Sequence, residues 1–231
     1  MAYCSSCGKE IEEGTEFCPH CGKNVTTGKR VRRPRDDFGT GITGNLNLAF
    51  NLALSKPMVF VPAVLSGLIS AVLDNIGETV FIGVILSLVV AAISFLLNFA
   101  SIDMSRDAYV GEPLDLMGSV NYVLERFLTF LVASIVGAVM TITVILIPVA
   151  LLMFVILVMD ETGIGDAVSE AVGVVGRNLG NMLVLFVISV IGFILLAFVP
   201  LAGGLLNSCF GVVLNLALMD LYEHDQRDAY R

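Results

Sequence analysis

No charged residue interrupts the run FLTFLVASIVGAVMTITVILIPVALLMFVILVM, which extends from Phe127 to Met159. As one helix this run would be about 50 Å long at 1.5 Å per residue. The hydrocarbon core of a bilayer is only about 30 Å thick. Pro148 suits the first turn of a helix. The run therefore predicts two membrane helices, at about 125–145 and 148–162, joined by a turn within residues 143–148.

Apolar runs on both sides extend this pattern. Each of them is close to the ~20 residues that one helical crossing requires. The sequence predicts an all-α membrane protein, a bundle of six transmembrane helices, with the four further spans at about 57–73, 79–102, 181–199 and 201–220. Residues 42–223 would form this six-span membrane domain, and residues 224–231 a cytosolic tail.

The composition fits lipid as the solvent. Hydrophobic residues make up 56% of the chain, charged residues only 15%, and the mean hydropathy is +0.88. Soluble domains have about 25% charged residues. The net charge is -8 and no domain is strongly basic, so we expect no nucleic acid as a partner.

The basic residues indicate the orientation, because cytoplasmic loops are enriched in Lys and Arg. With six spans, all 13 Lys and Arg residues lie on one side, and the opposite turns near 74–78, 143–148 and 199–203 contain none. With a single span in place of the central hairpin, Arg177 and the C-terminus would lie outside. We therefore expect a multi-pass plasma membrane protein with both termini in the cytoplasm.

The first 25 residues contain two CxxC pairs, each followed by glycine. Two residues between cysteines let a tight turn direct both thiolates at one point, and four thiolates suit tetrahedral zinc. No signal sequence precedes them, so we expect a reducing cytosol, where metal binding is favoured over disulfides. The predicted Zn²⁺ ligands are Cys4, Cys7, Cys18 and Cys21. A redox dithiol or disulfide pair is the alternative.

The segments Tyr3-Cys4-x-x-Cys7-Gly8 and Phe17-Cys18-Pro19-x-Cys21-Gly22 resemble the short zinc ribbons at the N-termini of many prokaryotic membrane proteins. The resemblance implies a zinc ribbon over residues 1–25. A closed site with four cysteines is structural and leaves no position for catalysis.

Residues 26–41 have no apolar periodicity and are predicted to form a flexible linker. Five basic side chains lie within seven positions of this linker: Lys29, Arg30, Arg32, Arg33 and Arg35. They can act as a topological signal that keeps the N-terminus in the cytosol. They can also bind the membrane surface, since each basic residue gains about 1 kcal/mol near anionic headgroups.

A weak threefold repeat runs through the membrane part. Residues 41–55, 115–126 and 163–181 each read as an amphipathic cytosolic helix, and a pair of spans follows each one. Such a repeat indicates duplication, although chance is the alternative in a hairpin-rich membrane protein. This alternation of an amphipathic helix and two spans resembles six-span membrane domains associated with glycerophosphodiester phosphodiesterases. The resemblance includes the stretch from Val158 to Ala167, which is followed by Arg177. No phosphodiesterase domain is present, so the resemblance implies no catalytic activity.

Ionisable residues gather near the predicted cytosolic ends of the spans: Asp103, Arg106, Asp160, Glu161, Arg177 and Asp220. They read either as interfacial charges and helix caps or as a polar pocket that faces the cytosol. Asn98, Asn207 and Asn215 lie deeper and are expected to form hydrogen bonds between helices, with an ion path as the alternative. Close helix packing is expected at Gly67, Gly83, Gly137, Gly192 and Gly211.

Three classes of function remain open. The leading hypothesis is a membrane-anchored adaptor or regulatory scaffold whose zinc ribbon binds an unknown protein partner, with membrane lipid as the other partner. The alternative is a transporter or channel for a small solute or lipid, which would need a site near the midplane. A lipid-acting enzyme is the weakest hypothesis, because the spans contain no histidine and no HExxH motif. We therefore predict that the protein is not an enzyme.

Overall fold

The computed structural model describes residues 2–3, 10–11, 41–75, 80–199 and 203–229, and the side chains of 41–69, 86–199 and 203–228 among them. Apart from one short strand pair and the connections between helices, these residues are helical. The strands are β1 (Ala2–Tyr3) and β2 (Glu10–Ile11). The helices are α1 (Gly41–Ser55), η1 (Pro57–Phe60), α2 (Val61–Asn75), α3 (Val80–Val110), α4 (Leu116–Glu125), α5 (Phe127–Thr141), η2 (Val144–Leu146), α6 (Ile147–Met159), α7 (Ile164–Arg177), α8 (Leu179–Ala197) and α9 (Gly203–Ala229).

The long uncharged run is broken as the sequence predicts. Helix α5 ends at Thr141 and α6 begins at Ile147, with Pro148 in its first turn. The short helix η2 lies between them, and α5 packs against α6. Proline has no backbone N–H group. The interior of a helix needs this group for a hydrogen bond, whereas in the first turn it would have no partner within the helix, so proline is tolerated there. The run therefore forms a helical hairpin.

The helices form three successive units, each an amphipathic helix followed by a hairpin of two helices: α1 with α2–α3, α4 with α5–α6, and α7 with α8–α9. A single non-helical residue separates the amphipathic helix from the hairpin. We call it the joint residue: Lys56, Arg126 and Asn178, with φ of -127°, -109° and -113°. The chain bends by 97° at the first joint and by 79° at the second.

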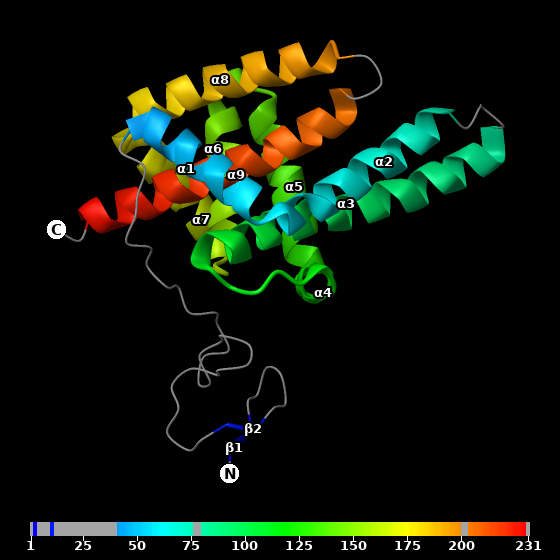
Figure 1. The fold of residues 1–231 in the computed structure, drawn as a ribbon, viewed down its shortest axis with the longest axis horizontal. Helices are drawn as coiled ribbons and strands as arrows, with labels where there is room; N and C mark the ends of the chain where they lie inside the picture. Colours follow the sequence, from blue (N-terminus) through cyan, green and yellow to red (C-terminus); the bar gives the residue numbers. More distant parts are fainter. Residues whose placement is uncertain (1, 4–9, 12–40, 76–79, 200–202, 230–231) are drawn as a thin grey trace.

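The contacts between units close into a ring (Figure 1). The second hairpin helix of one unit packs against the amphipathic helix of the next, α3 against α4 and α6 against α7, and α9 packs against α1. The second hairpin helices, α3, α6 and α9, also contact one another, and we call them the inner helices. The predicted threefold pattern is therefore present in the order of the helices and in their packing.

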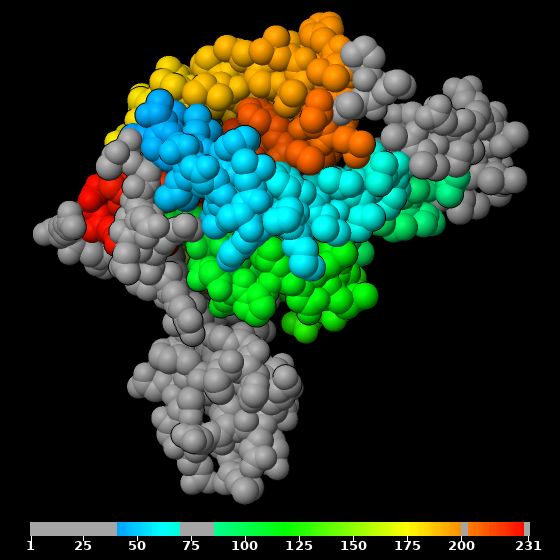
Figure 2. Space-filling view, viewed as in Figure 1, coloured from blue at the N-terminus to red at the C-terminus, as the bar shows by residue number. Residues whose placement is uncertain are grey.

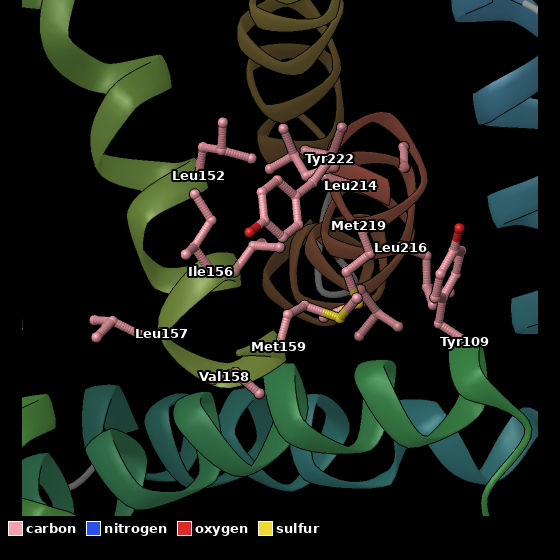
Figure 3. Close-up of a cluster of buried hydrophobic side chains, with 14 of the residues drawn as sticks. Tyr109, Leu152, Ile156, Leu157, Val158, Met159, Leu214, Leu216, Met219 and Tyr222 are labelled. Atoms are coloured by element: carbon pink, nitrogen blue, oxygen red, sulfur yellow. The ribbon is translucent and has the colours of Figure 1, made fainter. Parts of the chain in front are cut away.

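The hydrophobic core lies between the inner helices. Leu152 and Ile156 of α6 face Met219 and Tyr222 of α9 (Figure 3), and all four are fully buried. Apolar side chains also cover the outside, for example Phe198, which is 80% exposed. Helices α8, α1 and α2 form one outer face (Figure 2). An outer surface this apolar indicates contact with lipid.

Within the part of the chain that the structure describes, three to five helical segments are long and apolar enough to cross a membrane. Leu86–Val110, Leu179–Ala197 and Gly203–Asp228 qualify alone, and the bent pairs α1–α2 and α4–α5 would each add one. The sequence predicts six spans. Helices α5 and α6 have only 15 and 13 residues, or about 22 and 20 Å at 1.5 Å per residue, so neither reaches the usual length alone.

Two inner helices run further than the predicted spans. Helix α3 continues past residue 102 to Val110, and α9 continues through most of the predicted tail to Ala229. In these extensions, polar side chains such as that of Asp103 are themselves buried. Asp225 of α9, placed in the tail by the sequence analysis, is 7% exposed. Helix α9 therefore extends into the segment predicted as the cytosolic tail, and Asp225 is buried there.

The predicted glycine contacts hold at three positions. A Cβ atom on Gly67, Gly137 or Gly192 would lie 3.1 Å, 2.7 Å or 2.5 Å from a side chain of another helix, the last from Phe210. Gly211 differs, since a Cβ there would have no neighbour within 4 Å. The expectation of close packing at Gly211 is wrong. Gly83 lies outside the residues whose side-chain surroundings are described.

Candidate functional site

Polar side chains are buried where the inner helices approach the joints. We call them the polar layer, comprising residues 101–109 of α3, 160–162 after α6 and 220–226 of α9. Asp103 and Asp220 are 0% exposed and Arg106 is 1% exposed. Burying a charge is costly unless it is paired or hydrogen-bonded, so the partners of these groups reveal what the layer does.

Tyrosines connect two of the aspartates to neighbouring inner helices. The hydroxyl of Tyr109 on α3 donates to Oδ1 of Asp220 on α9 at 3.0 Å. The hydroxyl of Tyr222 on α9 donates to Oδ2 of Asp160 at the end of α6. These bonds join α3 to α9 and α9 to α6. Since a hydrogen bond to a charged group contributes about 1.5–3 kcal/mol, they fix the contacts between the inner helices.

Arg126, the joint residue of the second unit, binds the end of the inner helix in its own unit. Its Nη1 donates to the Leu157 carbonyl at 3.1 Å and to the Tyr122 hydroxyl at 2.9 Å, and Nη2 donates to the Thr162 carbonyl at 2.9 Å. Leu157 lies in the last turn of α6, whose carbonyls have no partner within the helix. Arg126 therefore caps α6, and its positive charge suits the negative end of the helix dipole.

The first unit repeats this arrangement. Lys56 is the joint residue, and its Nζ donates to the carbonyl of Ala108 at 3.0 Å. Ala108 lies in the last turn of α3, the inner helix of that unit. Lys56 therefore occupies the place that Arg126 has in the second unit.

In the third unit, the joint binds a carboxylate instead of carbonyls. Arg177 donates from Nε to Oδ1 of Asp225 at 3.1 Å and also from Nη2 to Oδ2, and Asn178 donates to the same carboxylate. These hydrogen bonds raise the pKa of the Arg177 guanidinium. Asp225 belongs to α9, so each joint binds the inner helix of its own unit.

The inner helices carry a sequence signal for this arrangement that the sequence analysis missed. Helix α3 reads Asn-Phe-Ala-Ser-Ile-Asp from Asn98 to Asp103, and α9 reads Asn-Leu-Ala-Leu-Met-Asp from Asn215 to Asp220. Asp160 occupies the corresponding place at the end of α6. The shared pattern NxAxxD relates the first unit to the third, and it would have directed attention to the three aspartates as equivalents.

Tyr122 lies beside the Arg126 cap and is almost completely buried. Burial raises its pKa to about 12; Arg126 opposes this rise, whereas the negative charges of Glu161 and Asp103 add to it. The α6–α7 connection next to it is strained, since Glu161 has φ of 53°, in the left-handed region that few non-glycine residues adopt. Asp103 and Glu161 therefore belong to the surroundings of the Arg126 cap.

Among the six predicted cluster residues, Asp160 and Asp220 accept hydrogen bonds from tyrosines. Arg106 forms an ion pair with Asp107 at 3.3 Å, and Arg177 binds Asp225. Neither Tyr109 nor Asp225 was predicted. Asp103, Arg106 and Asp220 are buried inside the protein.

The three deeper asparagines do not behave as predicted. Within the described part of the chain, none of them hydrogen-bonds another helix. Asn98 faces outward, Oδ1 of Asn207 is buried without a partner, and Asn215 lines a cavity. The expectation of hydrogen bonds between helices is therefore wrong, because depth in the sequence does not define the direction in which a side chain points.

The predicted zinc ligands and the basic linker residues lie outside the described residues. Strands β1 and β2 pair antiparallel, with Ala2 opposite Ile11 and Tyr3 opposite Glu10. Cys4 and Cys7 follow β1 directly and precede β2. Four thiolates are a donor set that fits tetrahedral zinc. Among the described residues, no group of three or more His, Cys, Asp or Glu side chains could hold a metal ion.

Comparison with known protein families gives a match for the N-terminal segment of the chain. Residues 3–25 match the zinc-ribbon domain. The N-terminal segment is a zinc ribbon. Zinc-ribbon domains commonly bind zinc, in agreement with the cysteine spacing. No curated protein and no solved structure matches the chain, and the resemblance of the helical part to phosphodiesterase-associated membrane domains stays a prediction.

Proposed function

We propose that this protein is a membrane-anchored scaffold that presents its zinc ribbon to a protein partner in the cytoplasm. The observation that carries the proposal is the use of the basic side chains at the joints between the amphipathic helices and the hairpins. Lys56, Arg126 and Arg177 are hydrogen-bonded to the inner helices of their own units, which favours a rigid platform. The recognition surface is then the zinc ribbon, and the role is binding rather than catalysis.

The zinc ion in this proposal is bound by Cys4, Cys7, Cys18 and Cys21. A segment this small has too few apolar residues for a core, and below about 40 residues folding usually needs a metal or disulfides. Metal binding then supplies the folding free energy of the ribbon. In this scaffold, the ribbon folds only when zinc is bound, and partner binding depends on zinc.

The membrane arrangement that we propose has six crossings with both termini in the cytoplasm. The hairpins α2–α3, α5–α6 and α8–α9 cross the plasma membrane, and α1, α4 and α7 lie at the cytoplasmic surface. Bends of 97° and 79° at the first two joints support this arrangement, because an interfacial helix lies across the direction of a span. The linker residues from Lys29 to Arg35 then lie beside anionic headgroups.

The test compares partner capture by the full chain and by the double variant Cys4→Ser/Cys21→Ser, purified from native membranes after crosslinking. We expect the double variant to lose the crosslinked partner and its zinc while remaining in the membrane fraction after alkaline carbonate washing. Cys209→Ser is the matched control, because Cys209 is a free cysteine in α9, outside the ribbon. Recovery of the same neighbours with both chains would contradict the scaffold proposal.

Transport of a small solute or lipid stays a prediction without a specific structural feature in its favour. The aspartates that could couple to an ion, the part-buried Asp160 and the buried Asp220, accept hydrogen bonds from Tyr222 and Tyr109. Solute flux in proteoliposomes that is abolished by Asp220→Asn would favour transport over the scaffold.

A further inference from the structure

A partly open cavity of about 80 Å³ lies between α6, α8 and α9. Its walls are almost entirely apolar and include Pro148 of α6 and Phe186 of α8. Helices α8 and α9 run as a hairpin, with α6 behind them in Figure 1. This cavity is separate from the tyrosine–aspartate pairs and from the three joints, and we call it the groove.

The groove is elongated along α8. Its lining residues on that helix extend from Met182 to Phe193, which corresponds to about 16 Å at 1.5 Å per residue. One leaflet of a bilayer has a hydrocarbon thickness of about 15 Å, half of the ~30 Å core. The groove is too small for another helix, since a helix with its side chains is about 10 Å wide. A single hydrocarbon chain fits its length.

One polar group in the groove needs a partner. The Asn215 side chain lines the groove and makes no hydrogen bond within the described part of the chain. Ser189, the other polar side chain there, donates to the carbonyl of Leu185 at 2.7 Å. An amide without a partner in hydrocarbon costs several kcal/mol. The Asn215 amide therefore favours the binding of a ligand that carries a hydrogen-bond acceptor.

Gly211 keeps the groove open. A Cβ atom at this position would have no neighbour within 4 Å, whereas a Cβ on Gly192 of α8 would lie 2.5 Å from the Phe210 ring. Gly192 therefore brings α8 and α9 together on one side, and Gly211, next to Phe210 on α9, faces open space. A larger side chain at Gly211 can occupy the groove without displacing the backbone.

We propose that the groove binds one acyl chain of a glycerophospholipid, with Nδ2 of Asn215 donating to an ester carbonyl oxygen. The groove ends near Leu218, two residues before Asp220 of the polar layer. A phospholipid has the same order, since its ester carbonyls lie between the hydrocarbon and the polar headgroups. The inference rests on the proposed membrane arrangement and goes beyond it, because it assigns a specific lipid site and not general contact with the bilayer.

The test uses the full chain, purified in detergent and depleted of lipid, with dioleoyl phosphatidylglycerol as the probe and native mass spectrometry as the readout. We expect wild type to bind one lipid. Gly211→Leu fills the groove and should lower the occupancy about tenfold. Asn215→Leu removes one donor, and a hydrogen bond of about 1 kcal/mol corresponds to a decrease of about fivefold.

Two matched variants control for indirect effects. Gly204→Leu places the same side chain on α9 at a glycine whose Cβ would also have no neighbour, away from the groove. Asn98→Leu alters the equivalent asparagine of the NxAxxD pattern, which is exposed on α3. Both should bind lipid as wild type does. Equal occupancy in wild type and both groove variants, or equal losses in the controls, would overturn the proposal.

A fluorescence measurement covers the case in which Gly211→Leu fails to fold. The chain has no tryptophan, so Phe186→Trp provides a single reporter in the groove. A phospholipid with brominated acyl chains should quench this reporter, and unlabelled phospholipid should restore the emission by competition. Oleic acid as the only effective competitor would assign the groove to free fatty acid and overturn the phospholipid proposal.

The membrane arrangement is tested separately by alkaline carbonate washing of native membranes. Release of the chain by this washing would contradict the membrane scaffold itself. Retention of the chain together with absent lipid binding would contradict only the groove proposal.

Discussion

The polar layer and the groove use the same inner helices, α6 and α9, in opposite ways. In the polar layer, side chains with a charge or a hydroxyl meet partners on another element, as Tyr109 meets Asp220. In the groove, the Asn215 amide lies among apolar side chains without such a partner. A polar group with a partner on another helix holds the helices together, whereas one without such a partner is available to a ligand. The sequence alone did not distinguish these two kinds of polar group.

The largest effect on stability is expected for Arg126→Met. This change keeps much of the apolar stem but removes the donors to the Leu157 and Thr162 carbonyls and to Tyr122. Since a buried acceptor without a partner costs about 1–3 kcal/mol, we expect a loss of about 3 kcal/mol in the free energy of unfolding. Unfolding of the purified chain in detergent micelles measures it.

Lys56→Met is the matched control for this comparison between joints. Lys56 has the same position in the first unit but donates to the Ala108 carbonyl, so we expect about 1 kcal/mol. Equal losses for the two variants would mean that the number of capped carbonyls does not determine the strength of a joint.

An intermediate effect is expected for Tyr109→Phe, which removes the hydroxyl that donates to Asp220. The expected loss is about 1.5 kcal/mol, because the acceptor is a buried carboxylate. A double-mutant cycle with Asp220→Asn isolates the coupling between the two side chains. A coupling energy near zero would assign the role of Asp220 to its other neighbours.

The smallest effect on stability is expected for Asn215→Leu in the lipid-depleted protein. The amide has no protein partner to lose, so we expect no decrease in the free energy of unfolding. The same variant is expected to bind phospholipid more weakly. A large destabilisation without lipid would place Asn215 with the structural groups of the polar layer and remove the contrast between the two regions.

Local sequence features were sufficient to predict much of the fold. The uncharged run with Pro148 predicted a hairpin, and apolar periodicity predicted the amphipathic helices around residues 41–55, 115–126 and 163–181. These features depend on neighbours within a few turns, where helix periodicity and proline geometry act. The number of crossings is harder to predict, because α5 and α6 are shorter than the apolar run that contains them.

The partners within the polar layer could not be predicted in the same way. Arg177 was grouped with Asp103 and Asp160, yet it binds Asp225, which lies in an apparent tail. That pairing depends on α9 continuing past residue 220 and packing against α7, a contact between distant parts of the sequence. The same holds for Asn215. Its position along the predicted span could be derived from the sequence, but the direction of its side chain depends on how α9 is rotated against α8.

Because α9 contacts α1, the three units form a closed ring, and the chain could begin at any of the three units without changing the contacts between them. Figure 1 places the beginning of α1 and the end of α9 on the same side of the molecule. A circularly permuted gene that begins at the exposed Gly111, between α3 and α4, and joins Ala229 to Gly41 through a linker would retain the contacts between neighbouring units. In that chain the zinc ribbon could be attached to a different unit. Its position could then be changed without changing the packing of the three units.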